Sequence, residues 1–248
     1  FKVYMCGVKG IYPHQDDGFI LDAMQRLKAL PADPVLCIHA ENTYIVDRAE
    51  QLLADQPMND LEQWRKTHPN IAEGEAVLRC AYLGGKTGVR TYVVHQSSKE
   101  SMEVLSKAKH ERFYVETTSP YLTRDTSSKV GAYGKMLPPF REPESRLALW
   151  DGIRKGLIDT IGTDNVTMTS AEKKMPQGMA GADAGSPALG THLVSVLNEG
   201  FFRQEIPLEK LVPLITMNPA KIFGVYPKKG TLLPGADADI VIVDMETV

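Results

Sequence analysis

The segment Thr-Tyr-Val-Val-His-Gln-Ser-Ser, residues 91–98, contains the pattern that decides the fold. Its first four residues are β-branched or aromatic, which predicts a buried strand. Ser98 is a good N-cap for a helix that the next residues predict as far as about Lys109. A strand followed directly by a helix favours a parallel sheet, because the helix returns the chain to the edge at which the next strand begins.

The same unit recurs along the chain. Strand-length apolar runs occupy residues 1–6, 35–38, 91–94, 113–117 and 160–163. Helical periodicity covers residues 17–30, 44–53, 71–83, 98–109, 143–156, 189–199 and 208–217. The Gly84-Gly85 pair is predicted to end the third helix. Near-continuous apolar strands favour an α/β fold with the sheet buried on both faces. Five strands suffice for an open doubly wound sheet, whereas a (β/α)8 barrel needs eight.

The end of the chain follows another pattern. Residues 230–248 contain glycine-rich turns and one strand-like run, over residues 239–243, that no helix follows. This predicts a separate layer or a small β domain. We therefore expect one unit over residues 1–223 and a second over residues 224–248. Two long irregular stretches, residues 118–142 and 165–187, are predicted to be functional or mobile loops.

Composition limits the classes of partner. With 43% hydrophobic and 24% charged residues, the 248-residue chain is typical of a globular protein. Its net charge of -3 gives no reason to expect nucleic acid or an anionic membrane as a partner. No apolar run approaches the roughly 20 residues that span a bilayer. The three cysteines form no close pair, which favours buried free thiols in a reducing, cytoplasmic location.

Three of the strand runs end in a residue type that binds metals. His39, His95 and Asp164 each follow an apolar run directly. The carboxyl ends of parallel strands meet at one edge, so these side chains are expected to converge there. Imidazole and carboxylate groups suit Zn²⁺, and also Mn²⁺, Fe²⁺ or Ni²⁺. A single such histidine is more often structural, and a single such Asp is often a helix cap. Three in one chain favour a site.

Lys2 interrupts the first strand run, where a central strand would be apolar. A buried ammonium costs several kcal/mol unless it is paired or neutralised. Lys2 could lie on an edge strand and face solvent. Alternatively its amine could react with CO2, and the resulting carbamate could bridge two cations. The residue pattern alone favours the solvent-facing alternative. His14, His68, His110 and His192 are predicted to be solvated or structural.

Several short motifs resemble those of the cyclic amidohydrolases, a family of hydantoinases, dihydropyrimidinases, allantoinases and dihydroorotases. They occur in the order that the family has, over nearly the whole chain. They are Phe-Lys-Val-Tyr-Met (1–5), Ile-His-Ala-Glu-Asn (38–42), Val-Val-His-Gln-Ser-Ser (93–98), Glu-Thr-Thr (116–118), Leu-Pro-Pro-Phe-Arg (137–141), Gly-Thr-Asp (162–164), Asn-Pro-Ala-Lys-Ile-Phe-Gly (218–224) and Gly-Ala-Asp-Ala-Asp-Ile-Val (235–241).

The resemblance implies roles for matching positions. Lys2 would be an N6-carboxylysine bridging two divalent cations, with zinc expected. His39 and His95 would bind the second metal, and Asp164 would bind the first and transfer the proton. The family's His-x-His pair has no counterpart in the chain. The five strands would then be about strands 4–8 of a (β/α)8 barrel, followed by part of a small β-sandwich. A homo-oligomer, dimer or tetramer, is implied.

Departures from the family pattern bear on the substrate. Gly7 stands where relatives usually have a Tyr that stabilises the oxyanion, and Tyr12 has the wrong spacing to replace it simply. Leu137, Asn165 and Gln177 match positions expected to contact substrate. The resemblance implies a small cyclic amide or imide, such as a hydantoin or dihydropyrimidine, as the substrate. The alternatives are allantoin, dihydroorotate, another amide or heterocycle, or a non-catalytic dihydropyrimidinase-related scaffold.

Overall fold

The predicted strands form one parallel sheet in the computed structural model, which describes residues 1–8 and 10–246. They pair in chain order, and every pair is parallel. The α/β prediction is therefore confirmed. The strands are β1 (Lys2–Tyr4), β2 (Val35–His39), β3 (Arg90–Val93), β4 (Phe113–Thr118) and β5 (Thr160–Gly162).

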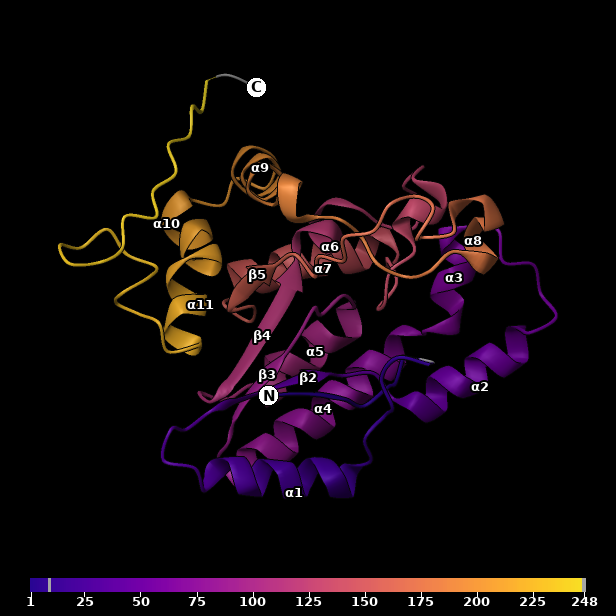
Figure 1. Cartoon of the computed structure of the whole chain (residues 1–248), viewed down its shortest axis with the longest axis horizontal. Helices are drawn as coiled ribbons and strands as arrows, with labels where there is room; N and C mark the ends of the chain where they lie inside the picture. The colour runs from indigo at the N-terminus through magenta and orange to yellow at the C-terminus, as the bar shows by residue number, and fades with distance from the viewer. Residues whose placement is uncertain (9, 247–248) are drawn as a thin grey trace.

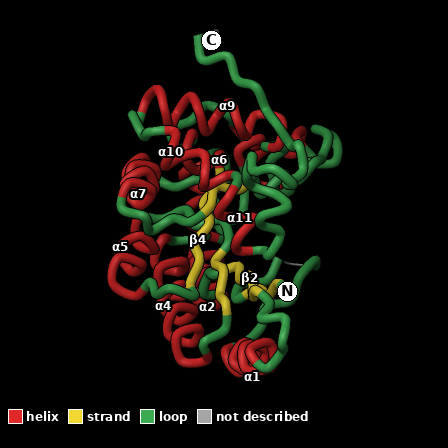
Figure 2. Tube along the Cα trace, turned by 90° about the vertical axis from the view of Figure 1, so that its left-hand side faces the viewer, coloured by secondary structure: helices red, strands yellow, loops and turns green. Residues whose placement is uncertain are grey.

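Helices cover the sheet and its ends (Figure 1). Figure 2 shows α4, α5 and α7 along one side of the strands. The α-helices are α1 (Asp17–Lys28), α2 (Thr43–Leu53), α3 (Leu61–Thr67), α4 (Asn70–Thr87), α5 (Lys99–Ala108), α6 (Ser119–Thr123), α7 (Pro143–Arg154), α8 (Gly178–Gly181), α9 (His192–Val196), α10 (Leu208–Leu211) and α11 (Met217–Ile222). The 3-10 helices are η1 (Gly131–Gly134), η2 (Met175–Gln177), η3 (Leu189–Thr191) and η5 (Val212–Ile215), and η4 (Leu197–Arg203) is a π-helix.

The two faces of the sheet pack differently because side chains alternate along a strand. Leu36 and Ile38 of β2 are fully buried in the main apolar core, which also contains Met24 of α1 and Trp150 of α7. Val35 belongs to a separate small cluster with residues such as Tyr92. His39 alternates with Val35 rather than with Ile38, so it lies on the face opposite the main core.

Helix α4 runs through the glycine pair that was predicted to end it. Its last residue is Thr87, and Gly88 follows in the left-handed conformation that commonly terminates helices. Gly84 serves close packing instead, because a Cβ there would lie 2.6 Å from Oγ1 of the buried Thr91 on β3. The predicted start of α5 is confirmed, since Ser98 Oγ accepts a hydrogen bond from the Ser101 backbone nitrogen.

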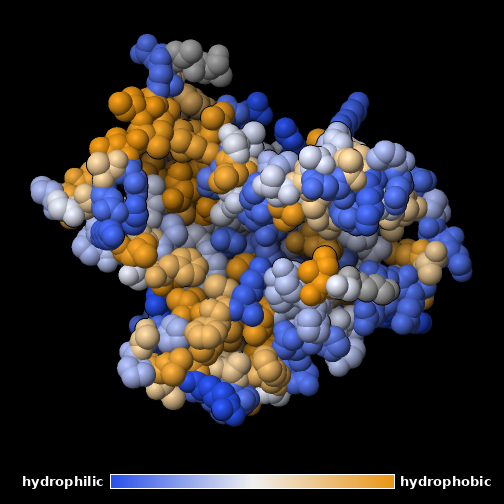
Figure 3. All heavy atoms as spheres, in the orientation of Figure 1, coloured by the Kyte–Doolittle hydropathy of each residue, from blue (hydrophilic) through white to orange (hydrophobic). Residues whose placement is uncertain are grey.

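The predicted strand over residues 239–243 is absent from the described part of the chain. A strand needs a neighbour for its backbone hydrogen bonds, and this segment extends away from the sheet (Figures 1 and 2). Its apolar side chains are exposed, and apolar atoms gather at the upper left of Figure 3, where the segment lies. Residues 247–248 lie outside the described residues. No described helix combines the length and apolar character that crossing a bilayer requires.

Substitution of Gly84 by Ala should destabilise the fold although Ala favours helices. The added Cβ must displace Thr91, and overpacking of this kind costs about 1–3 kcal/mol. Gly85→Ala is the matched control, because its Cβ would meet His110 Nε2 only at 3.5 Å. That variant should gain about 0.5–1 kcal/mol. Urea unfolding of the full-length protein measures both, and equal stability of the two variants would contradict the packing role.

Candidate functional site

A cavity of about 1080 Å³ brings together the four side chains expected to bind metal: Lys2, His39, His95 and Asp164 all line it. His39 is the last residue of β2, and His95 and Asp164 follow the ends of β3 and β5. Lys2 on β1 pairs with Cys37 on β2, two residues before His39. Its side chain therefore begins further from the carboxyl ends of the strands than that of His39, but it is longer. The structure therefore places all four side chains along one cavity, and their binding of metal stays a prediction.

The two histidines lie side by side in the wall of the cavity, with one ring nitrogen of each facing the other. His39 Nδ1 lies 3.1 Å from His95 Nε2. Two imidazole nitrogens bound to one tetrahedral zinc ion at about 2.0–2.1 Å would be about 3.3 Å apart. Burial, with the charges of His39 and Lys2, holds the pKa of His95 well below its ordinary value. His95 is therefore neutral and offers a lone pair, which is the form that binds a cation.

Two of these residues have an unusual backbone conformation. His95 and Asp164 have φ values of 43° and 45°, in the left-handed region that non-glycine residues seldom adopt. The backbone nitrogen of His95 donates a 3.1 Å hydrogen bond to Glu116 Oε1, and Tyr92 OH donates to Glu116 Oε2 at 2.8 Å. Strained residues of this kind cluster at functional sites, where surrounding contacts hold them in place. Here the strain turns both side chains toward the cavity.

Lys2 lies on the edge strand β1, is exposed, and also lines the cavity. Its Nζ is 5.0 Å from the centre of the Tyr4 ring. The amine is thus accessible to a small reactant such as CO2 from the cavity side. Burial raises the pKa of Asp164, while the charges of Lys2 and His39 act in the opposite direction. A divalent cation nearby would favour the ionised carboxylate further.

A buried network behind His39 was not predicted from the sequence. Glu41, with no exposed surface, contacts His39 Nε2 at 2.9 Å and His68 Nδ1 at 3.2 Å. Arg141 Nη2 donates to the same carboxylate at 3.4 Å. His68 was expected to be solvated or structural, and it is 5% exposed and also lines the cavity. The motifs at residues 38–42 and 137–141 contain Glu41 and Arg141, but nothing in either motif shows that they meet.

Glu41 controls which nitrogen of His39 faces the cavity. Burial raises the pKa of Glu41, but the charge of His68 and the hydrogen bonds of both histidines outweigh this and leave it well below its ordinary value. The ionised carboxylate keeps a proton on His39 Nε2. The lone pair of His39 is therefore on Nδ1, which points toward His95. A carboxylate of this kind orients metal-binding histidines in many proteins.

Glu73 of α4 fixes the turn after His95 in a similar way. Its Oε1 accepts hydrogen bonds from the backbone nitrogen and Oγ of Ser97, and its Oε2 accepts from the Ser98 backbone nitrogen. Arg141 Nε also donates to Ser97 Oγ at 2.9 Å. Strand β3, its following turn and helix α4 are therefore held as one unit.

The donor set fits a cation only if Lys2 contributes. In the described part of the chain, no three His, Cys, Asp or Glu side chains are close enough to hold a metal by themselves. The facing nitrogens of His39 and His95 supply two donors. The amine of Lys2 becomes an oxygen donor once it is a carbamate. The residues present therefore fit a metal bound with a modified Lys2.

The residues expected to contact substrate are distributed unevenly. Leu137 lines the cavity, but Asn165 and Gln177 are not among its described lining residues. Asn165 is turned into its own loop, where it donates to Thr167 Oγ1 and accepts from the Leu189 backbone nitrogen. Gln177 is exposed on η2. Contacts of Asn165 and Gln177 with substrate remain predictions.

Gly7 cannot carry a larger side chain in this fold. A Cβ there would lie 2.6 Å from the Tyr12 carbonyl oxygen and 2.7 Å from the His14 nitrogen, because the chain folds back over it. Tyr12 itself lines the cavity and stacks on Tyr4, with ring centres 4.6 Å apart. The aromatic group missing at position 7 is therefore present nearby on another residue.

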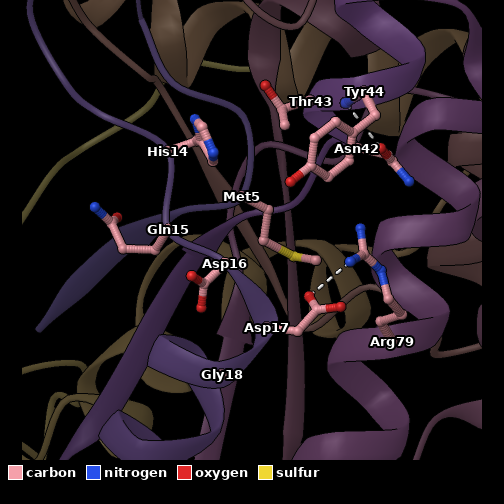
Figure 4. A pocket seen from close by; sticks show the side chains of 10 residues that line it. All are labelled: Met5, His14, Gln15, Asp16, Asp17, Gly18, Asn42, Thr43, Tyr44 and Arg79. Atoms are coloured by element: carbon pink, nitrogen blue, oxygen red, sulfur yellow. Dashed lines mark hydrogen bonds and ion pairs between the residues drawn. The ribbon is translucent and has the colours of Figure 1, made fainter.

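A smaller cavity of about 290 Å³ lies beside the loop before α1 (Figure 4). Arg79 reaches Asp17 across it, and Met5 and Tyr44 point into it. None of the four candidate ligands lines this cavity. The candidate site is therefore the larger cavity.

Comparison with known proteins agrees with this geometry. Residues 140–247 match the model of the Amidohydrolase family. The chain is 33% identical to an L-hydantoinase of Paenarthrobacter aurescens over 99% of this chain and 55% of that protein. It is 29% identical to an allantoinase of Deinococcus radiodurans over 96% of this chain and 56% of that protein.

Nearly the whole chain is therefore similar to proteins of the amidohydrolase family. Among solved structures, it resembles the L-hydantoinase (dihydropyrimidinase) from Arthrobacter aurescens with a TM-score of 0.88 and 31% identity, covering 96% of this chain and 54% of that one. The chain spans about half the length of the curated relatives it matches.

Replacing Glu41 with Gln should weaken metal binding. The amide cannot supply the negative charge that holds the proton on His39 Nε2, so zinc affinity should fall by about 10–100-fold. Competition with a chromophoric chelator measures this on the full-length protein. Glu103→Gln is the control, because Glu103 is exposed on α5. Unchanged affinity in the Glu41 variant would argue against the orienting role.

Proposed function

We propose that the full-length protein is a metal-dependent hydrolase that opens a cyclic amide or imide ring of the hydantoin or dihydropyrimidine type. The observation that carries the proposal is the presence of Lys2, His39, His95 and Asp164 in one cavity. Amidohydrolases generally depend on a metal, and the similarity to the L-hydantoinase supports this substrate class.

Two divalent cations, with zinc expected, would be held by these residues. His39 and His95 would bind one cation, Asp164 would bind the other, and a carbamate on Lys2 would bridge them. When bound, the cations supply Lewis-acid activation of water and of the scissile carbonyl. The neutral state of His95 and the orientation of His39 by Glu41 support this assignment.

Asp164 would move the proton. Its half-buried carboxylate accepts a proton from the attacking water and returns it to the leaving nitrogen. Burial raises the pKa of Asp164, which makes its carboxylate a stronger base than an exposed one. Its left-handed backbone, with φ of 45°, aims the side chain at the cavity.

Recognition of the ring would come from the cavity wall. Leu137 is in position to contact it, and we retain Asn165 and Gln177 as contacts that require movement of their loop. Tyr12 would take the place of the aromatic residue that relatives have at position 7.

Hydrolysis of allantoin is the second candidate, because an allantoinase covers nearly the whole chain at 29% identity. A non-catalytic scaffold is disfavoured, since Lys2, His39, His95 and Asp164 all line one cavity. For the whole protein we propose a (β/α)8 barrel to which this chain contributes about strands 4–8. Residues 224–248 would belong to a small β-sandwich, and the barrel would assemble as a homo-oligomer.

Loss of the Asp164 carboxylate should abolish turnover. Proton transfer by a positioned side chain contributes about 10²–10⁴-fold, so Asp164→Asn should lower kcat at least 100-fold. Metal-reconstituted full-length protein is assayed with hydantoin, dihydrouracil, allantoin and dihydroorotate. Asp151→Asn is the control and should retain activity, because Asp151 is an exposed carboxylate on α7 that pairs with Lys155. Wild-type turnover by the Asp164 variant would refute its role.

Lys2 should carry a carboxyl group when metal is bound. Mass spectrometry of the intact, metal-loaded protein under native conditions should show the corresponding increment, which acid should remove. Lys2→Met should lose both the increment and most of the bound metal, whereas Lys28→Met on α1 should keep both. An unmodified Lys2 in protein containing its full complement of metal contradicts the carbamate.

A further inference from the structure

Lys173 is a buried lysine whose hydrogen bonds all go to backbone carbonyls. Its side chain lies in the loop after β5, and the residue is only 2% exposed. Nζ donates to the carbonyl oxygens of Lys135 at 3.0 Å, Asp183 at 2.9 Å and Gly185 at 2.6 Å. An ammonium has three donors, so these three bonds use its full capacity.

Burying the ammonium of Lys173 costs free energy, which its hydrogen bonds must offset. Burial and the charge of Lys135 lower the pKa of Lys173 to about 8, against the charge of Asp183. The Asp183 carboxylate does not offset the burial by direct pairing, because it lies 3.0 Å from Nζ of the exposed Lys174. Backbone carbonyls from two separate segments supply the compensation instead.

Those carbonyls belong to the wall of the candidate active site. Lys135 and residues 182–185 line the same cavity as the four candidate ligands. Lys135 precedes Leu137, the one expected substrate contact on the wall. The two segments also meet directly, because the Gly185 nitrogen donates to the Lys135 carbonyl at 2.9 Å. Lys173 thus strengthens a single junction between them.

Other contacts also hold this junction and the loop. Lys135 Nζ donates to the Ala180 carbonyl and lies over the Trp64 ring, and the Val166 nitrogen donates to Ser186. Within the loop, Met179 is buried in the main apolar core, Tyr133 OH lies 3.0 Å from Ser170 Oγ, and the helices η2 and α8 are short. Removing the ammonium would leave three carbonyls without this donor, and buried acceptors of this kind seek water. The loop would then separate from the Lys135 segment.

We infer that Lys173 is a positioning residue that fastens the 166–185 loop to the Lys135–Leu137 segment and so holds the substrate-facing wall of the cavity. This inference rests on the proposed function for its meaning in catalysis. Lys173 contacts none of the four candidate ligands in the described hydrogen bonds and ion pairs. It should therefore affect substrate binding without affecting metal binding.

The test compares Lys173→Met with Lys174→Met in the metal-loaded, full-length protein. Methionine keeps the length and apolar stem of lysine but removes the donors. Lys174 is next in sequence, yet among the described residues its side chain pairs only with Asp183, in an exposed ion pair that contributes little. Hydrogen exchange measured by mass spectrometry should become faster in residues 180–186 and 133–137 of the Lys173 variant alone.

Kinetics provide the second readout. If the Lys173→Met variant has its cavity wall ordered about one-tenth of the time, its KM should rise about tenfold. Its kcat and its bound metal should stay close to those of the wild type. Equal exchange rates in the two variants would overturn the inference, as would loss of metal together with the change in KM. If no substrate is turned over by the wild type, the proposed function fails, but the exchange experiment still decides the role of Lys173.

A second variant covers the case in which Lys173→Met does not fold. Lys173→Gln retains an amide donor on a shorter side chain and should reach fewer of the carbonyls. Its exchange rates in residues 180–186 should lie between those of wild type and a fully released loop. Wild-type protection in a folded Lys173→Gln protein would count against the fastening role.

Discussion

The buried carboxylate of Glu41 is the constraint on which the site depends. A charge with no exposed surface is stable only if it is paired and hydrogen-bonded, and breaking one partner of such a group typically costs about 3–5 kcal/mol. Its partners come from three places: His39 at the end of β2, His68 after α3, and Arg141 before α7. The same contacts that stabilise the charge fix the ring of His39, so the stability of this region and the geometry of the site cannot be separated.

Convergence of the candidate ligands follows from the sheet, and their orientation follows from local strain. Parallel pairing in chain order brings the ends of β2, β3 and β5 to one rim. The left-handed backbone at His95 and Asp164 then turns these side chains into the cavity. Glu116 and Glu73 hold the chain on either side of this turn at β3, by accepting hydrogen bonds from backbone nitrogens. Rigid elements therefore position the metal-binding side of the cavity.

The opposite wall is built by different means. It consists of irregular chain after η1 and after β5, and its order comes from backbone carbonyls gathered around the ammonium of Lys173. A site with one rigid wall and one fastened loop can keep its metal geometry while its substrate-binding surface varies. A rigid metal-binding wall and a separate substrate-facing wall agree with the similarity of this chain to both a hydantoinase and an allantoinase.

The sequence by itself determined the five strands and the position of His39, His95 and Asp164 at their ends, because apolar runs and the residues that follow them are local features. It also identified Lys2 as anomalous, although the residue pattern alone favoured solvent over the cavity. The partners of Glu41 and the acceptors of Lys173 required the tertiary structure, since each set joins segments distant in sequence. The same is true of Gly84, which packs against Thr91 instead of ending α4, and of Gly7, over which the chain folds back. Residues 239–243 have strand propensity, but a strand forms only where another backbone supplies hydrogen bonds, and that depends on what lies beside it in space.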